Sequence, residues 1–319
     1  MKYGIIIPTF NNVHLTLNCV ESVQKNTNNY HIYWMDDCSD MKNFRQVKAF
    51  LDKNKINYSF TRNEENLGFI KTVNKGLKKA LKDNVEYIII LNNDTIIHSA
   101  QWVESMANVF EHNDKIGVVG PLCPGSVQSP NFLAKYDDRF PQDISEQYKA
   151  KTHAELNKYI NKKFKGLFLE TYDRLAFFCV MIRPDMIKEV GLLDEVYGHG
   201  YYDDDDLCER IFRRGWSGAV ACDIFVTHIS EKSFEKKFST EKWAKIKKEI
   251  YKKNKDIFEK KFAYGKYEKI IPNANKNELQ VRLWRKQREV RILEKEVEFM
   301  QKSKFWKARE KYISFKGRL

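Results

Sequence analysis

Short apolar runs alternate with amphipathic stretches through the first 120 residues, and this alternation constrains the fold more than any other feature of the sequence. Two of the runs, residues 4–7 and 87–91, are apolar throughout. Strands of this kind are covered on both faces, which happens when helices pack on either side of a parallel sheet. We therefore predict an α/β fold with a doubly wound, mainly parallel sheet. The predicted strands are 3–7, 30–35, 56–61, 86–91 and 116–119, and the predicted helices are 13–25, 42–54, 70–81 and 101–111.

The next part of the chain is less regular. Between residues 121 and 175 the periodicity fades, which indicates loops and a helix laid over the sheet edge, a natural place for a second substrate. Regular elements resume with a predicted strand at 177–182 and a short helix at 185–190. A helix at 207–214 and a strand at 219–226, followed by His228, complete the predicted domain.

Polar, acidic and flexible residues collect where the predicted strands end. Ligands bind at the carboxyl ends of the strands in doubly wound sheets, so a binding site is expected there. No glycine-rich motif of the GxGxxG or Walker type competes for a phosphate group. The residues at the strand ends are Pro8, Thr9 and Asn11; Asp36 and Asp37; Arg62, Asn66 and Gly68; and Asn92, Asn93 and Asp94.

Four consecutive carboxylates, Asp203 to Asp206, precede the predicted helix at 207–214. Adjacent ionised carboxylates repel one another, so a cluster of this kind is held by a cation, a proton or a helix N-terminus. The cluster therefore points to chemistry. In the alternative interpretation, all four acids only favour the positive end of the helix.

Seven of these segments, in this order, resemble the motifs of family 2 glycosyltransferases with the GT-A fold, of the bacterial, rhamnosyltransferase-like type. The resemblance covers residues 2–233. It implies transfer of a sugar from a nucleotide diphosphate donor to an acceptor hydroxyl, with inversion at the anomeric carbon. The segments are residues 5–11, 35–40, 63–69, 91–95, 191–195 and 203–210, and His228.

The resemblance also implies a divalent metal, Mn²⁺ or Mg²⁺, that neutralises the leaving diphosphate. Asp94 stands at the last position of the family's "DXD" motif, whose first acid is replaced here by Asn92. His228 resembles the family's histidine that reaches the metal or the diphosphate. The alternatives without metal binding are an N-cap role for Asp94 and a structural role for His228.

The family places its catalytic base in a Glu/Asp-Asp motif just before a helix. Alignment of residues 206–210 with the family's Asp-Leu-Cys-x-Arg makes Asp204 the base and Asp203 the substitute for the usual Glu, although the alignment could slip by one residue. The base would take a proton from the acceptor hydroxyl during attack.

The resemblance places the donor nucleotide at the first strand ends, with a UDP- or dTDP-linked sugar expected. Asp36 would accept a hydrogen bond from the N3–H of uracil or thymine. Pro8 and Thr9 would line the base and ribose pocket, Arg62 would reach phosphate, and the turn at 66–68 would bring backbone close to the nucleotide. Ordinary turn chemistry is the alternative for these residues. The set also includes Asn11, Asp37, Asn66, Gly68, Asn92 and Asn93.

The tail carries the basic charge of the chain. Residues 230–319 hold 28 Lys and Arg against 13 Asp and Glu, whereas residues 1–229 hold 28 against 30. We expect a catalytic domain at 1–233, with halves at about 1–120 and 121–233, and a basic helical tail at 234–319. Trp243, Ile246, Ile250 and Ile257 recur at near-helical spacing and predict a helix that docks on the domain or on an anionic membrane. Residues 279–300 carry about three heptads, which predict a homo-oligomer or a solitary amphipathic helix.

Cysteine usage and hydropathy indicate a cytoplasmic protein, with the tail available for peripheral contact with a membrane. The six cysteines are scattered without a CxxC pair, and no apolar run approaches the ~20 residues that cross a bilayer. The expected acceptor is a glycan or a lipid-linked glycan. One rival is a nucleic-acid-binding or scaffold protein with an inactive transferase domain, but no nucleic-acid module is recognisable and no nucleic acid is expected. Another is a sugar nucleotidyltransferase, which would need a glycine-rich basic loop after the first strand.

Overall fold

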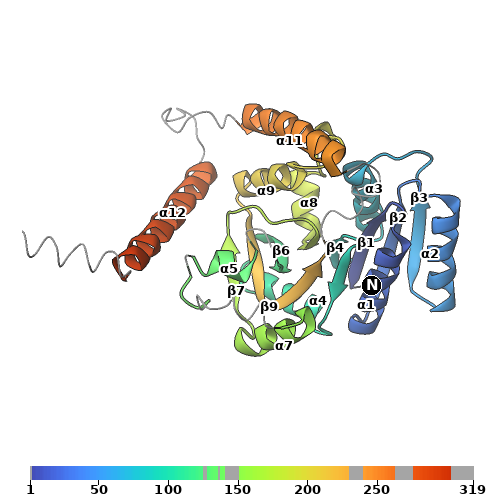
Figure 1. The fold of residues 1–319 in the computed structure, drawn as a ribbon, viewed down its shortest axis with the longest axis horizontal. Coiled ribbons are helices and arrows are strands. Elements are labelled where there is room, and N and C mark those ends of the chain that lie inside the picture. Colours follow the sequence, from blue (N-terminus) through green and yellow to red (C-terminus); the bar gives the residue numbers. More distant parts are fainter. Residues whose placement is uncertain are drawn as a thin grey trace, which may run out of the picture.

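The computed structural model describes residues 2–124, 128–135, 137–140, 151–229, 240–262 and 276–302, and it confirms an α/β fold (Figure 1). Nine strands within these ranges form one sheet. Its first half is parallel, as predicted, with the strands in the order β3-β2-β1-β4. These strands are β1 (Tyr3–Thr9), β2 (Tyr30–Asp36), β3 (Tyr58–Arg62) and β4 (Tyr87–Leu91).

The second half of the sheet is mixed. β8 (Cys179–Ile182) runs antiparallel between β4 and β6 (Ile116–Leu122), and β9 (Ser217–His228) runs parallel to β6. Two short strands that the sequence did not predict, β5 (Thr95–Ile97) and β7 (Phe168–Thr171), pair antiparallel with β9. Because β8 is reversed, it begins at the edge where β1, β2, β4, β6 and β9 all end. We call this edge the carboxyl edge.

Helices cover both faces of the sheet. On β1, Ile6 belongs to the apolar core of one face, whereas Ile5 and Ile7 belong to the core of the other, which explains why this strand is apolar throughout. The core around Ile5 includes α1 (Val13–Asn26), α2 (Met41–Lys53) and α4 (Trp102–Phe110). The core around Ile6 includes α3 (Phe69–Lys82), α5 (Pro130–Leu133), α7 (His153–Lys163), α8 (Pro184–Val190) and α9 (Asp203–Arg213).

The helix predicted at 207–214 begins earlier than expected. α9 starts at Asp203, so the four aspartates form its first turn instead of preceding it. Carboxylates there lie in the positive field of the helix N-terminus, which stabilises an extra turn. A short 3₁₀ helix (Glu195–Tyr197) and a loop at 198–202 lead into α9.

The tail helix α11 (Thr240–Phe262) packs on the loop before α9 (Figure 1). Nδ2 of the buried Asn254 lies 2.8 to 3.0 Å from the carbonyl oxygens of Tyr197, Gly200 and Tyr201. The ring of Phe258 lies 5.4 Å from that of Tyr202. The helix therefore docks on the main domain, which is one of the two outcomes predicted for it.

The last described helix, α12 (Lys276–Lys302), also contacts the domain, and Val281 is its buried residue. The side chain of Trp243 and the predicted boundary near residue 233 lie outside what the structure describes. No helix in the described ranges is long and apolar enough to cross a membrane. All six cysteines are free thiols, and five of them are buried.

Replacement of Asn254 by Ala tests the docking of α11. The change removes the donor shared by three carbonyl oxygens, and we expect the free energy of unfolding to fall by about 2 kcal/mol in chemical denaturation. The neighbouring Lys255 is exposed, so Lys255→Ala is the matched control and should change stability by less than about 0.5 kcal/mol. Equal effects of the two substitutions would show that Asn254 does not hold this helix in place.

Candidate active site

The predicted site residues at the strand ends form two groups along the carboxyl edge. β1 and β2 are parallel and in register, so Thr9 pairs with Asp36, and Arg62 of β3 pairs with Asp36 on the other side. The second group lies beyond β4, where Asn92, Asn93 and Asp94 follow Leu91. His228 ends β9 opposite Thr95.

Asp36 presents one oxygen without a partner. Its Oδ2 accepts a hydrogen bond from the backbone N of Ser39 at 3.2 Å and pairs with the Arg62 guanidinium, whereas its buried Oδ1 has no hydrogen-bond partner. Burial raises the pKa of Asp36, and the contacts with Ser39 and Arg62 oppose that rise. A buried acceptor of this kind favours a ligand that brings its own N–H.

Arg62 is engaged in a different way from the phosphate contact predicted for it. Its guanidinium pairs with Asp36, donates to the carbonyl oxygen of Ser39 at 2.6 Å and lies 4.8 Å from the ring centroid of Phe44. Arg62 therefore orients Asp36 in this structure.

Asp37 anchors the turn at 63–68. Its Oδ1 accepts from the backbone N of Leu67 at 2.8 Å and from Nδ2 of Asn63 at 2.8 Å, and its Oδ2 accepts from the backbone N of Gly68 at 2.9 Å. Nδ2 of Asn66 donates to the carbonyl oxygen of Asp37 at 3.3 Å. Both carboxylate oxygens of Asp37 are thus used by the protein itself.

Gly68, which belongs to the turn predicted to approach the nucleotide, lies close to His199 in the loop before α9. Its φ is +82°, and a Cβ built on it would lie 2.6 Å from Nδ1 of His199. A side chain there would collide with the loop before α9. Gly68 therefore lets the turn at 63–68 pack closely against the loop before α9.

Pro8, Thr9 and Asn11 fit the alternative of ordinary strand-end and turn chemistry. Pro8 is buried within β1, and Oγ1 of Thr9 accepts from Nε1 of Trp34 at 2.8 Å. Asn11 has a φ of +53°, and its Oδ1 accepts from the backbone N of Asp40 at 2.9 Å and from Nδ2 of Asn43 at 2.8 Å. These contacts fix the end of β1 and the turns that follow β1 and β2, next to Asp36.

Asp94 and His228 come together as predicted for a pair of metal ligands. Nε2 of His228 lies 3.2 Å from Oδ1 of the buried Asp94, and the His228 ring stacks on Phe178 at 4.8 Å. Asp94 precedes a strand, β5, and α4 starts only at Trp102, so the alternative of an N-cap role is wrong. Asn93 instead donates from Nδ2 to Oγ1 of Thr16 at 2.9 Å.

The donor atoms at this point fit a hard divalent cation. Oδ1 of Asp94, which lies 3.2 Å from Nε2 of His228, and Oδ1 of Asn92 are both buried and accept no hydrogen bond. Carboxylate, amide and imidazole groups suit Mn²⁺, and the oxygen atoms also suit Mg²⁺. In the described ranges no three His, Cys, Asp or Glu side chains form a metal-binding group. A cation held here would take its remaining ligands from diphosphate and water.

The four aspartates divide into one structural residue and three others. Asp206 is fully buried, and it pairs with Arg210 at 2.6 Å and with Lys261 of α11 at 2.5 Å while it accepts from the Tyr197 hydroxyl at 3.0 Å. Within the described ranges, one cation, Arg174, pairs with two of the other three. Arg174 lies 3.1 Å from Oδ2 of Asp204 and 3.5 Å from Oδ1 of Asp205.

Burial and mutual repulsion raise the pKa of two carboxyl groups in the cluster. Burial, followed by the neighbouring carboxylates, raises the pKa of Asp203 to about 8, and the same causes raise the pKa of Asp205 to about 7. Asp203 therefore keeps its proton near pH 7, where Asp205 is only about half protonated. Asp204 faces Arg174 directly, and its side chain is partly exposed.

Arg174 is a site residue that sequence reasoning missed. It lies in the segment 121–175 that was assigned to loops, where nothing in the local pattern singles it out. The segment 174–178 links the aspartate cluster of α9 to the residues that follow β4. Leu175 N donates to Sγ of Cys208 in α9, and the Phe178 carbonyl accepts from Asn92 N at 2.7 Å. Four residues span at most about 14 Å, so the backbone that contacts Asn92 and the backbone that carries Arg174 lie close together at the carboxyl edge.

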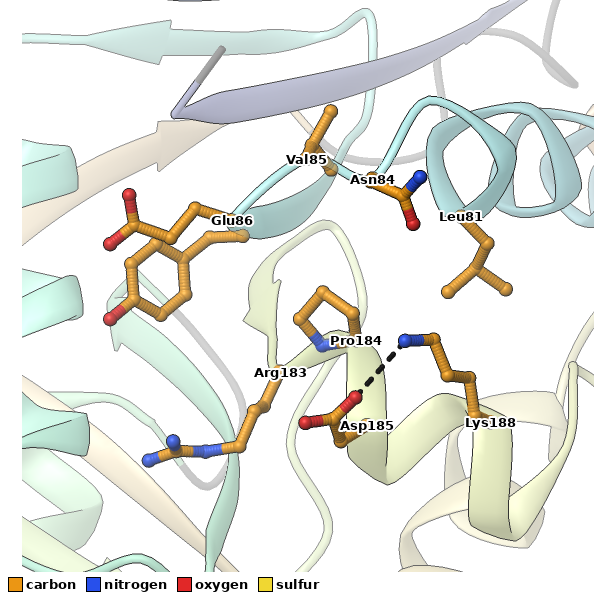
Figure 2. A pocket seen from close by; sticks show the side chains of 9 residues that line it. Leu81, Asn84, Val85, Glu86, Arg183, Pro184, Asp185 and Lys188 are labelled. Carbon is orange, nitrogen blue, oxygen red and sulfur yellow. Dashed lines mark hydrogen bonds and ion pairs between the residues drawn. The ribbon is translucent and has the colours of Figure 1, made fainter.

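A separate hollow of about 300 Å³ lies at the opposite edge, where β4 starts and β8 ends (Figure 2). Its charged residues include Lys188 and Asp185, which pair at 3.1 Å. None of its lining residues belongs to the predicted site. Besides those two, they are Leu81, Asn84, Val85, Glu86, Tyr87, Arg183 and Pro184.

A family model described as glycosyl transferase family 2 matches residues 4–190. The chain belongs to this family. Asp94 lies inside the matched range of this glycosyltransferase, whereas the aspartate cluster and His228 lie beyond it. No curated protein matches the chain in a sequence comparison.

Solved structures share the fold of this glycosyltransferase. The crystal structure of GalNAc-T7 with UDP, GalNAc and Mn²⁺ gives a TM-score of 0.54 at 16% identity, over 72% of this chain and 44% of that chain. The crystal structure of S. aureus TarS 1-349 in complex with UDP-GlcNAc gives 0.50 at 17% identity, over 73% and 60%. The chain thus covers less than two thirds of either protein.

The raised pKa of Asp203 predicts a pH-dependent stability. In the folded protein this group holds its proton up to about pH 8, whereas an unfolded aspartate loses it near ~3.9, so stability falls as pH rises between these values. Asp203→Asn removes the charge and keeps the shape. We expect the variant to be more stable than the wild type by at least about 1 kcal/mol at about pH 8.5, with little difference at about pH 4, in urea denaturation without nucleotide or cation.

Asp185→Asn is the matched control for this prediction, because the Asp185 carboxylate lies at the surface in a weak pair with Lys188. Its pH profile should follow that of the wild type. If Asp203→Asn also retains the wild-type slope, the burial of Asp203 does not govern the pH dependence.

Proposed function

We propose that this glycosyltransferase inverts the anomeric configuration of a sugar as it moves the sugar from a UDP- or dTDP-linked donor to an acceptor hydroxyl. One observation carries the proposal. The Asp94–His228 pair and the aspartate cluster both contact the segment 174–178, the first through Phe178 and the second through Arg174. This link supports a diphosphate site and a base site within reach of one bound sugar, as sugar transfer requires.

The donor base is proposed to bind at Asp36. Its buried Oδ1 is an unused acceptor at the ends of β1 and β2. The N3–H of uracil or thymine offers the donor that such an oxygen needs, whereas cytosine has no hydrogen at N3. Arg62 would keep the Asp36 carboxylate ionised and correctly oriented.

The diphosphate is proposed to lie near Asp94 and His228, with Asn92 as a neutral oxygen ligand. A divalent cation held by these residues would neutralise the charge that develops on the leaving diphosphate. The amide of Asn92 adds no charge, so this cation site depends on the donor phosphates for part of its affinity. Asn93 contributes by holding the strand end against α1.

Asp204 is the proposed base. A base must be ionised and reachable, and Asp204 is paired with Arg174 and partly exposed, whereas Asp203 is buried and holds a proton. The Asp204 carboxylate takes the acceptor proton while the acceptor oxygen attacks the anomeric carbon. The bond from that carbon to the diphosphate oxygen breaks on the opposite face, which inverts the configuration.

The acceptor is proposed to be a glycan or a lipid-linked glycan beside an anionic membrane. One face of α11 packs on the domain, and the other face exposes lysines that include Lys245, Lys248 and Lys252. We expect the protein to float with vesicles that contain anionic lipid and not with neutral vesicles. Replacement of these three lysines by Glu should abolish flotation, and flotation that survives would remove the membrane from the proposal.

The reaction is tested by a screen of nucleotide sugars with Mn²⁺, Mg²⁺ or a chelator, with release of the nucleoside diphosphate as the readout. We expect a UDP- or dTDP-sugar to be used only with the metal present. Asp204→Asn should lower the transfer rate by about 10²–10⁴-fold and leave donor binding intact, because the amide cannot take the proton.

Asp203→Asn and Asp205→Asn are the matched controls, because they remove neighbouring carboxylates of the same turn. A larger loss of rate in either than in Asp204→Asn would move the base by one position. Release of diphosphate that is independent of all three would overturn the assignment of the cluster.

A further inference from the structure

The tail helix α12 attaches to its own domain by residues seven apart. Val281 is 2% exposed, Arg288 pairs with Asp173 at 2.8 Å, and Lys295 pairs with Asp138 at 2.5 Å. A repeat of seven keeps these three side chains on one face of the helix. Arg285 adds a pair with Glu209 of α9 at 3.1 Å.

The opposite face of α12 is apolar and exposed. In the heptad pattern, the apolar residues of this face occupy the two core positions. Val281, Arg288 and Lys295 occupy the position that points directly away from the core. Lys286 takes the one remaining core position. The six apolar side chains are between 45% and 60% exposed: Leu279, Leu283, Val290, Leu293, Val297 and Met300. We call these six residues the seam.

The charges beside the seam are divided along the helix. Basic residues, Arg282 and Lys286, lie toward the start of α12, and acidic residues, Glu289, Glu294 and Glu296, lie toward its end. A parallel pair of helices would place each Lys286 against its copy and Glu289 near Glu294. An antiparallel pair places the basic half of each helix against the acidic half of the other.

We propose that the seam binds the seam of a second copy, as an antiparallel and isologous dimer. Pairing centred near residue 288 brings Leu283 of one copy against Leu293 of the other and Leu279 against Val297. Arg282 then lies beside Glu296 of the other copy, twice by symmetry. The proposal does not depend on the transferase reaction.

The attachment of α12 to its domain makes this pairing more favourable. A helical segment with three heptads is marginal when it must fold and associate at once. Here the helix is already held by Val281, Arg288 and Lys295, so pairing does not have to order it. The docked row faces away from the seam, so each domain stays on the outer side of its own helix.

The test is the molar mass of the full chain by sedimentation across a range of concentrations. We expect a dimer, and we expect Leu283→Glu with Leu293→Glu to weaken it by at least about 100-fold, because four charges would enter the contact. Arg291→Glu is the matched control, since Arg291 is exposed outside the seam, and it should keep the dimer. Thermal unfolding would check that every variant still folds.

Orientation is tested by exchange of one charge pair. Arg282→Glu and Glu296→Arg should each weaken the antiparallel dimer, and the double variant should restore it. Restoration would not occur in a parallel pair, so its absence would overturn the orientation. A wild-type monomer at all concentrations, a dimer unaffected by the seam variant, or a monomer that binds anionic vesicles through the seam would each overturn the proposal.

Discussion

The reversed strand β8 brings the segment that contacts both the Asp94–His228 pair and the aspartate cluster to the carboxyl edge of the sheet. It starts where β4 ends, so the segment 174–178 that leads into it must cross the carboxyl edge. Phe178 therefore reaches Asn92 and the His228 ring, while Arg174, four residues earlier, reaches Asp204 in α9. Groups more than a hundred residues apart are thus joined by five residues of backbone.

An imbalance of charge gives the same edge its chemical character. In the part of the chain that the structure describes, two cations pair with Asp206 and several N–H groups bind Asp37, whereas one cation, Arg174, pairs with Asp204 and Asp205. Burial and the neighbouring carboxylates raise the pKa of Asp203 and of Asp205, whereas Asp204 pairs with Arg174 at 3.1 Å. Asp36 keeps a buried oxygen without a hydrogen-bond partner, and Oδ1 of Asp94 accepts no hydrogen bond although it lies 3.2 Å from Nε2 of His228. These two buried oxygens lie at the carboxyl edge of the sheet, at the ends of β2 and β4.

The sequence predicted the parts of this arrangement that depend on local pattern. Apolar runs predicted β1 and β4, and the order of the motifs assigned Asp94 and His228 to the same predicted metal site. Long-range contacts were beyond its reach. β7 and Arg174 lie in a stretch without periodicity, and the pairing of Arg62 with Asp36 depends on the register of two neighbouring strands. The early start of α9 was missed because four like charges oppose a helix except at its N-terminus.

The loop before α9 explains why the tail belongs to the catalytic architecture. Tyr201 and Tyr202 both have positive φ, 66° and 70°, in a conformation that costs a non-glycine residue of order 1 kcal/mol or more. The loop keeps this conformation because Asn254 binds its carbonyl groups and Phe258 packs on Tyr202. The direction in which Asp203 and Asp204 leave the loop is therefore set by α11. A domain cut before this helix would lose the contacts that hold the loop and Asp206 in place.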